Sequence, residues 1–417
     1  MKELDITIPS EIFLQPSTMA DIKAQAQRAS IMVEEIRAKM LAPSASKTSP
    51  VFIQKEVAEA CGLEPGQFSY RMKNADLHAL PEGHWDAKSR RREFSLAETR
   101  TWVKEFRKDR LRPPGGEAVV IAVANFKGGV GKSTTTMTLA QGLSLLGHRV
   151  LIIDADPQGS LSTLTGLVPD IDVQEEDTFL PLCLGEEESI RYAIRSTYWD
   201  GLDIVAAAPL LFGIEFSLPA RQVKESRDGF EFWNVLNLGI DDVRQDYDVI
   251  LIDTAPALSY GTVNALYAAN GIIMPLPPNA LDFASGAQFW TLFTDLTENL
   301  IGAAGVEKTF DFINVLLSRV DNDDASTMVR KWIIQTYGDK VLPAEIPRTV
   351  VTSAASAEFN TVYDISRYDG NARTYKRARD AYDNLVQYME GVVRAVWQRD
   401  IKRRQATSQT SAALEGA

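Results

Sequence analysis

The chain has 417 residues, of which 45% are hydrophobic and 24% charged, with 44 Lys and Arg against 56 Asp and Glu. This length and composition predict a soluble protein of two or three well-cored domains. There is no run of eighteen apolar residues, which excludes a membrane span, and the N-terminus lacks the apolar segment of a signal peptide. The net charge of −12 argues against a generally basic nucleic-acid coat but leaves local basic patches open.

A helix is predicted over residues 17–41, which contain no Pro or Gly and repeat apolar residues at helical spacing, with Ser17 or Thr18 as its cap. Its apolar stripe has to be buried, either against a neighbouring part of the chain or against a second chain. We therefore expect residues 1–45 to form an N-terminal helical region with a possible role in dimerisation. A linker follows at 43–50.

Residues 50–112 form a small basic domain. From Arg71 to Arg112 the sequence holds twelve Lys and Arg against seven Asp and Glu. Residues 53–74 predict two helices joined by a turn, a spacing that resembles a helix-turn-helix, in which the second helix enters the major groove of DNA. The candidate DNA-binding side chains lie on that second helix and on a following wing: Gln67, Ser69, Tyr70, Arg71, Lys73, Lys88, Arg90, Arg91 and Arg92. A solvated basic helical hairpin is the alternative.

The two cysteines, Cys61 and Cys183, lie in different predicted domains. This excludes a disulfide framework and a thiolate metal cluster within one chain, and it indicates a reducing cytoplasm.

From Glu117 onward, short and uniformly apolar runs alternate with helical patterns. The runs are typical of strands buried on both faces, so we expect a parallel α/β sheet. The predicted strands are 119–125, 150–154, 248–253, 271–276 and 312–319. A charged helix is expected over 372–404 and a disordered tail over 405–417.

A glycine-rich turn follows the first of these strands and opens a helix. Its backbone N–H groups are suited to bind phosphate oxygens, Lys132 to reach the β- and γ-phosphates, and Ser133 to ligate Mg²⁺. The plain P-loop pattern fails at one position, where Phe126 replaces glycine, but Lys127 adds a second lysine to the loop. The nucleotide-binding candidates are Lys127, Gly128, Gly129, Val130, Gly131, Lys132, Ser133 and Thr134.

The segment 127–133 resembles the deviant Walker A box, KGGxGK[ST], of the ParA/MinD ATPases. In that family the first lysine, here Lys127, reaches across a dimer to the partner's nucleotide. The resemblance implies that Asp156 positions the attacking water and that Asp154 supports the metal and water network. Asp253, at the end of a hydrophobic strand, corresponds to the Walker B acid that holds Mg²⁺ through water.

Two later segments, 275–288 and 316–322, resemble the family's dimer-contact and base-contact boxes. They make Ser318 and Arg319 nucleotide-binding candidates, although these residues, like Asn279 and Asp282, could also be loop-capping residues. Residues 346–365 resemble a stretch near the nucleotide and the DNA-binding face. The candidates for nonspecific DNA binding are Arg348, Arg373, Lys376, Arg377 and Arg379.

The resemblance covers about residues 117–404, and the N-terminal part matches the larger ParA proteins that carry a helix-turn-helix before the ATPase domain. It implies a DNA-segregation ATPase that uses ATP and Mg²⁺, dimerises, binds operator and nonspecific DNA, and works with a ParB-type adaptor in the cytoplasm on the nucleoid. The alternative is a MinD-like membrane-associated ATPase. That reading requires a terminal amphipathic helix with an apolar membrane face, which is not evident here.

Overall fold

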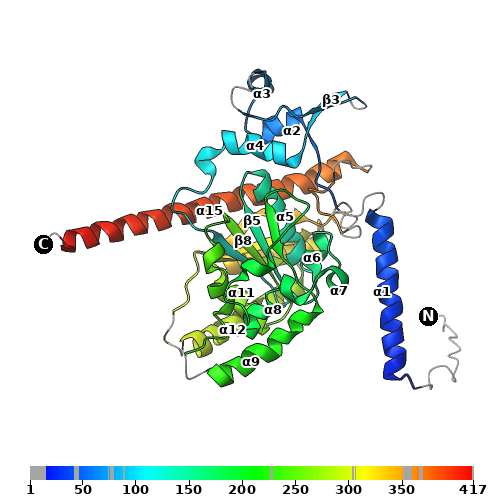
Figure 1. The fold of residues 1–417 in the computed structure, drawn as a ribbon, viewed down its shortest axis with the longest axis vertical. Coiled ribbons are helices and arrows are strands. Elements are labelled where there is room, and N and C mark those ends of the chain that lie inside the picture. The colour runs from blue at the N-terminus through cyan, green and yellow to red at the C-terminus, as the bar shows by residue number, and fades with distance from the viewer. Residues whose placement is uncertain are drawn as a thin grey trace. The chain divides into compact units, whose positions relative to one another are not determined.

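The computed structural model describes residues 16–41, 47–73, 75, 79–87, 90–225, 229–302, 305, 307–349, 351, 359–365 and 370–415. The chain divides into two compact units, residues 1–47 and 48–417. In the first unit, α1 (Met19–Leu41) forms the predicted helix (Figure 1). The Thr18 hydroxyl accepts a hydrogen bond from the Asp21 N–H at 3.2 Å, which is the expected N-terminal cap. The predicted linker at 43–50 lies partly outside the described residues.

The second unit begins with a small winged-helix subunit, residues 48–112. Its elements are β1 (Phe52–Ile53), α2 (Gln54–Ala60), α3 (Pro65–Met72), β2 (His84–Asp86), β3 (Arg91–Phe94) and α4 (Leu96–Phe106). The three strands form a sheet in the order β1-β3-β2. This subunit has its own core, in which the Phe68 and Trp102 ring centroids lie 4.6 Å apart. The two helices predicted over 53–74 and the turn between them are therefore present.

The remainder is an eight-stranded sheet in the order β11-β10-β9-β4-β8-β5-β7-β6. Its strands are β4 (Val119–Val123), β5 (Val150–Ala155), β6 (Arg195–Ser196), β7 (Leu202–Val205), β8 (Val249–Thr254), β9 (Gly271–Leu276), β10 (Phe312–Val320) and β11 (Val341–Pro347). All pairings are parallel except that of the edge strand β6 with β7. The predicted parallel α/β fold is thus confirmed, and the sequence pattern missed β6, β7 and β11.

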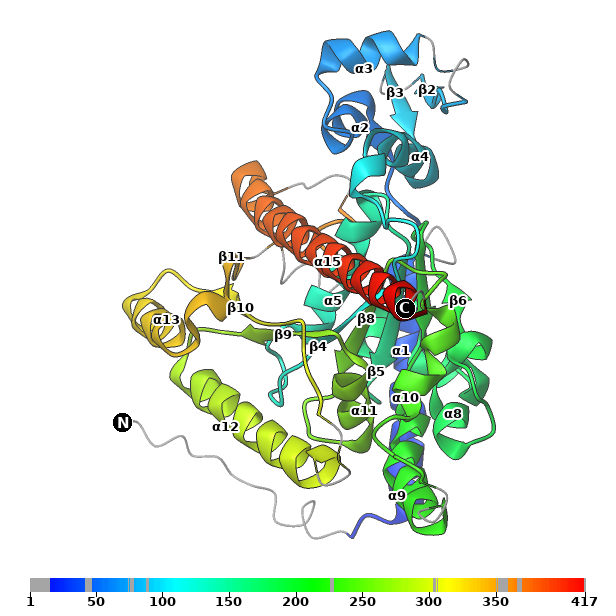
Figure 2. The same cartoon turned by 90° about the vertical axis from the view of Figure 1, so that its left-hand side faces the viewer.

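Helices cover both faces of this sheet (Figures 1 and 2). They are α5 (Lys132–Leu145), α6 (Ser160–Leu164), α7 (Pro169–Asp172), α8 (Leu180–Leu184), α9 (Ile214–Glu225), α10 (Val235–Gly239), α11 (Tyr260–Ala268), α12 (Ala280–Leu296), α13 (Asp324–Tyr337) and α15 (Ala372–Glu415). Alternate strand residues point to opposite faces. Val120 and Ile250 join a core with α8 to α13, whereas Ile121 and Leu251 join a core with α5 and α15.

Helix α15 is longer than predicted. It continues to Glu415, so residues 405–415, which the sequence analysis assigned to a disordered tail, are helical in the structure. The segment contains no Pro or Gly before Gly416, and nothing in it terminates a helix. None of the helices described is long and apolar enough to pass through a membrane.

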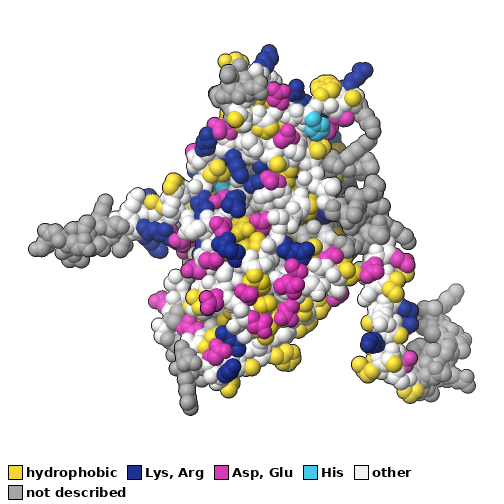
Figure 3. Space-filling view, viewed as in Figure 1, with side chains coloured by type: hydrophobic (Ala, Val, Ile, Leu, Met, Phe, Trp, Pro, Cys, Tyr) yellow, Lys and Arg dark blue, Asp and Glu magenta, His cyan; other side chains and the backbone are white. Residues whose placement is uncertain are grey.

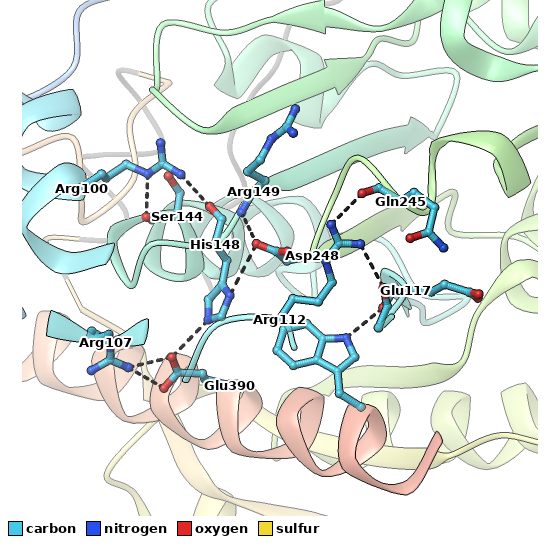
Figure 4. A network of polar contacts seen from close by, with 12 residues as sticks. Arg100, Arg107, Arg112, Glu117, Ser144, His148, Arg149, Gln245, Asp248 and Glu390 are labelled. Carbon is cyan, nitrogen blue, oxygen red and sulfur yellow. Dashed lines mark hydrogen bonds and ion pairs between the residues drawn. The ribbon is translucent and has the colours of Figure 1, made fainter. Parts of the chain in front are cut away.

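Arginines join the winged-helix subunit to the part of the chain that contains the eight-stranded sheet (Figure 4). Arg100 of α4 is buried and donates to the carbonyl oxygens of Ser144 and His148 at 2.9 and 2.8 Å, at the C-terminal end of α5. Cationic groups stabilise helix C-termini because the last carbonyl groups lack intrahelical donors. Arg107 donates to both carboxylate oxygens of Glu390 on α15 at 2.7 Å. The subunit is therefore fixed on the two helices that cover one face of the sheet.

Candidate nucleotide site and DNA-binding surfaces

The glycine-rich loop lies between β4 and α5, as the sequence predicted. Gly129 and Gly131 have φ angles of +74° and +95°, a region in which side chains are strained, so these two positions require glycine. Val130 is buried between them. The loop therefore has the backbone conformation that exposes N–H groups at a helix N-terminus, which is suited to bind phosphate.

Lys132 begins α5, and its ammonium group donates to the Lys127 carbonyl oxygen at 3.0 Å. Burial lowers the pKa of Lys132 from its usual value, and the carboxylates of Asp253 and Asp156 oppose this shift. The ammonium group thus lies in a desolvated site between the loop and two acidic side chains. It is placed to neutralise phosphate charge there.

Asp253 is the next-to-last residue of β8, and its two buried carboxylate oxygens have no hydrogen-bond partner among the residues that the structure describes. Burial and the neighbouring Asp154 raise the pKa of Asp253 well above its usual value, while the Ser133 hydroxyl and Lys132 oppose the rise. A buried carboxylate without hydrogen bonds beside a hydroxyl fits a Mg²⁺ site that is completed by water and phosphate. Within the described part of the chain, no group of three or more His, Cys, Asp or Glu could hold a metal by itself.

The two acidic residues after β5 have different environments. Asp154 is fully buried and accepts hydrogen bonds from the Ser162 N–H and hydroxyl, both at 2.8 Å, and from the Asp156 N–H at 3.2 Å. These contacts favour a positioning role for Asp154. Asp156 accepts only the Gln158 N–H, at 3.0 Å, among the contacts described, and it lines the pocket beside the glycine-rich loop. Burial raises the pKa of Asp156, opposed by that hydrogen bond and by Lys132.

Lys127, expected to reach a partner's nucleotide, forms an ion pair with Asp282 of its own chain. Asp282 lies in the first turn of α12, where its N–H donates to the Asn279 side-chain oxygen at 2.9 Å. Asn279 is therefore a helix cap, which agrees with the capping role that the sequence analysis left open for it. Any role of Lys127 in a dimer requires this ion pair to open.

The end of β10 contacts the glycine-rich loop directly. The Ser318 hydroxyl donates to the Val130 carbonyl oxygen at 2.9 Å, and the Arg319 guanidinium donates to that of Gly129. Arg319 has a φ of +52°, a conformation that is uncommon for a residue with a side chain. Both candidates thus lie at the loop, where they support its backbone.

A pocket of about 550 Å³ brings these residues together. Its lining includes the whole of 128–135, together with Asp156, Ser318, Arg319 and Arg348. It also includes residues that the sequence analysis did not single out as candidates: Ser160, Thr163, Leu164, Pro256, Ile346, Pro347, Phe359 and Tyr382. The only sequence signal for some of these was the resemblance of the 346–365 stretch to a segment near the nucleotide.

The candidate DNA-binding residues of the winged-helix subunit lie at its surface. Gln67, Ser69, Tyr70, Arg71 and Lys73 are exposed, whereas Phe68 between them is in the core. Arg90 and Arg91 are exposed at the β2–β3 hairpin, and Arg92 is half-buried and donates to the Glu82 carbonyl oxygen at 2.7 Å. Lys88 lies outside the described residues. Figure 3 shows Lys and Arg side chains at the outer end of this subunit.

The second basic group lies on α15, beside a groove of about 610 Å³ that Arg373, Lys376 and Arg377 help to line. All three are exposed. The prediction for Arg379 was wrong, because its guanidinium packs 4.2 Å from the Tyr363 ring centroid and hydrogen-bonds Asp383 at 3.2 Å. Arg379 faces the protein, since the helix places it on a different side from Arg377.

Comparisons with known proteins agree with this geometry. Residues 118–303 match a family model described as an AAA domain. The chain is 35% identical to protein SopA of Escherichia coli K12 over 288 residues, which is 68% of this chain and 71% of that one. It is 34% identical to the chromosome partitioning protein ParA of Caulobacter vibrioides, over 63% of this chain and 92% of that one. A solved structure titled "Partition Protein" matches its fold with a TM-score of 0.63 at 19% identity, over 89% of this chain and 98% of that one.

Proposed function

Because the chain belongs to the ParA family of partition ATPases, we propose that it segregates DNA in an ATP-switched cycle and also binds its own operator. The observation that carries this proposal is that one compact unit holds both a two-lysine glycine-rich loop at a helix N-terminus and a basic subunit with two helices joined by a short turn. The enzyme hydrolyses ATP to ADP and phosphate, with Mg²⁺ as cofactor. The site of this reaction is the pocket beside the glycine-rich loop.

In this pocket the loop N–H groups and Lys132 bind the phosphates. Ser133 and Asp253 would hold Mg²⁺, which supplies charge neutralisation to the transferring phosphoryl group. Asp156 orients the attacking water, because its residue lines the pocket and its carboxylate accepts a single hydrogen bond among the contacts described. Asp154 keeps Asp156 in place through the Asp156 N–H.

Dimerisation follows ATP binding in this proposal. Lys127 leaves Asp282 and contacts the phosphates bound by a second copy. Helix α1 gives a second means of pairing, since Met19, Ile22, Ile31 and Met32 are all more than half exposed in its unit. Unpaired apolar side chains on a helix favour association with another helix.

Two DNA-binding activities follow from the two basic surfaces. Helix α3 and the β2–β3 hairpin bind the operator, with α3 in the major groove. Arg373, Lys376 and Arg377 bind any DNA, and pairing of two subunits doubles this weak patch. Arg348 lines the nucleotide pocket, and its guanidinium lies 3.4 Å from the Asp321 carboxylate. In this position Arg348 would contact DNA and also change its contacts when a nucleotide binds. In this proposal the protein works with a ParB-type adaptor, and it acts in the cytoplasm on the nucleoid.

The test is ATP turnover by the full chain with and without DNA, combined with light scattering in ADP and in a non-hydrolysable ATP analogue. We expect slow basal turnover, dimerisation only with the analogue, and nonspecific DNA binding only in that state. Equal binding of nonspecific DNA with ADP and ATP would contradict the switch.

A further inference from the structure

We propose that Phe359 forms the surface on which the purine base of the nucleotide stacks, and that a buried hydrogen-bond network anchored on α5 holds it there. This inference deepens the proposed function, since it concerns the same pocket. It assigns a role to one side chain of the 346–365 stretch, for which the sequence indicated only a place near the nucleotide.

The lining of the pocket combines polar and apolar groups. Glycine N–H groups, Lys132 and Asp156 make one part polar, as phosphate binding requires. The remaining lining includes the apolar residues Leu164, Ile346, Pro347 and Phe359. An apolar wall with an aromatic side chain is the usual environment for a flat heterocycle.

Phe359 is the accessible aromatic group of this lining. Its residue is 43% exposed, whereas the other aromatic residue of the lining, Tyr382, is 4% exposed and belongs to the core with α15. Tyr382 can therefore support the pocket from behind but offers little surface to a ligand. Of these two residues, Phe359 therefore offers the larger accessible surface to a base.

The backbone at Phe359 is strained. Its φ is +54°, a left-handed conformation that is a genuine outlier for a bulky side chain. Such conformations persist only where the surrounding structure determines them, and they are concentrated at ligand-binding and catalytic positions. The strain thus needs an anchor close by in the chain.

That anchor begins two residues later. The Thr361 hydroxyl donates to the Gln141 side-chain oxygen at 2.5 Å, and the Thr361 N–H donates to Asp364 at 2.7 Å. Asp364 also accepts from the Tyr198 hydroxyl at 2.5 Å and from the Gln141 amide at 3.0 Å. Thr361 and Gln141 are buried, so the network is shielded from water, where such hydrogen bonds are strongest.

Gln141 lies on α5, the helix that starts at Lys132. The network therefore holds Phe359 in a fixed position relative to the residues that bind the phosphates. This arrangement is pre-organised for a ligand with a charged end and an aromatic end. Stacking uses the face of the base and not its hydrogen-bonding edge, so it supports affinity for any purine nucleotide.

The experiment compares ATP, GTP and inorganic tripolyphosphate, which has no base, by calorimetry on the full-length protein. We expect Phe359→Ala to weaken ATP and GTP binding by about fivefold or more, in line with alanine substitutions of stacking residues, and to leave tripolyphosphate binding unchanged. Phe359→Trp should keep ATP affinity within about twofold. Phe216→Ala, a change to a 78% exposed phenylalanine on α9, is the control and should change neither.

Three outcomes decide the proposal. If Phe359→Ala binds ATP as tightly as the natural protein, the stacking role is wrong. If Phe359→Ala weakens tripolyphosphate as much as ATP, or Phe359→Trp binds ATP as poorly as Phe359→Ala, the residue only maintains the pocket. If the natural protein binds neither ATP nor tripolyphosphate, the proposed nucleotide site itself fails, a result that is distinguishable from the other two.

Discussion

Arg107 of α4 and Glu390 of α15 form a nearly buried ion pair in which one guanidinium nitrogen lies 2.7 Å from both carboxylate oxygens. Glu390 also lies 3.1 Å from His148 Nε2, so one carboxylate links three segments of the chain. The two partners are 283 residues apart in sequence. No local motif predicts such a contact.

We expect Glu390→Ala to lower the free energy of unfolding by about 3 kcal/mol or more, because it removes the carboxylate partner of the nearly buried Arg107 guanidinium and one of the two carboxylates beside the buried His148 imidazole. Chemical denaturation of the full-length protein measures this. The control is Lys108→Ala, which removes an exposed ion pair with Glu105 and should cost less than about 1 kcal/mol. Equal effects of the two substitutions would contradict the structural role of Glu390.

His148 should make stability depend on pH. Burial alone would lower its pKa, but the carboxylates of Asp248 and Glu390 outweigh burial and raise the pKa above its usual value. A raised pKa contributes stability that is fully present below the unfolded-state pKa of about 6.5 and is lost as pH rises through the folded-state value. The stability difference between the natural protein and His148→Gln, measured by urea denaturation, should therefore shrink as pH rises above about 6.5. A difference that grows with pH would show that His148 is buried in its neutral form.

Lys132 and Asp156 should have separable effects on the ATPase. We expect Lys132→Ala to abolish nucleotide binding or turnover, because it removes the buried cation of the phosphate site. Asp156→Ala should bind ATP and lose about 100-fold or more in kcat, as expected for a group that orients the attacking water. Calorimetry and phosphate release measure the two quantities, and Asp170→Ala on α7 is an exposed acidic control. Normal turnover by Asp156→Ala would show that another group positions the water.

Lys127→Ala should affect association more than binding. We expect the ATP affinity to stay within about threefold of the natural value, because Lys127 does not contact the phosphates bound by its own chain in this proposal. Dimerisation driven by a non-hydrolysable analogue should be lost. Light scattering with a non-hydrolysable analogue tests this, with Lys331→Ala on α13 as the exposed control. Unchanged dimerisation would exclude a role of Lys127 across the interface.

The two DNA activities should respond to different substitutions. Arg71→Ala should weaken operator binding by about tenfold, as expected for a lost base contact, while Lys55→Ala, on the neighbouring α2, should not. Alanine at Arg373, Lys376 and Arg377 together should weaken nonspecific binding and reduce its salt slope by about one per lost phosphate contact. Fluorescence anisotropy in a salt series measures both. Loss of both activities in Arg71→Ala would mean that one surface binds all DNA.

The central strands and the phosphate-binding loop could be predicted because their signals are local. Val119–Val123 and Val249–Thr254 are uniformly apolar runs, and such runs indicate strands buried on both faces. Strand β11 escaped prediction because Pro343 and Pro347 argue against a strand, and an edge position is what tolerates them.

Residues whose role depends on distant contacts could not be found in this way. The orientation of Arg379 depends on Tyr363 and Asp383, which approach it only in the folded chain. The ion pair of Lys127 with Asp282 joins the glycine-rich loop to the first turn of α12, and several strands lie between them in the sequence. Phe359 lies in the 346–365 stretch that resembles a segment near the nucleotide, but this resemblance singles out no side chain. The importance of Phe359 follows from its backbone angle and its place in the pocket.

The contacts of Arg100 have a consequence for how this protein unfolds. Leu96 of the same helix is buried in the core beneath α5 and α15. A Cβ atom at Gly201 would lie 2.0 Å from the Arg100 guanidinium, so a glycine at this position is needed for Arg100 of α4 to fit. Removing residues before 117 would expose that apolar surface to water and leave Glu390 without Arg107. The two predicted domains on either side of residues 112–117 therefore share a core and should unfold together. We expect residues 48–415 to melt in a single transition.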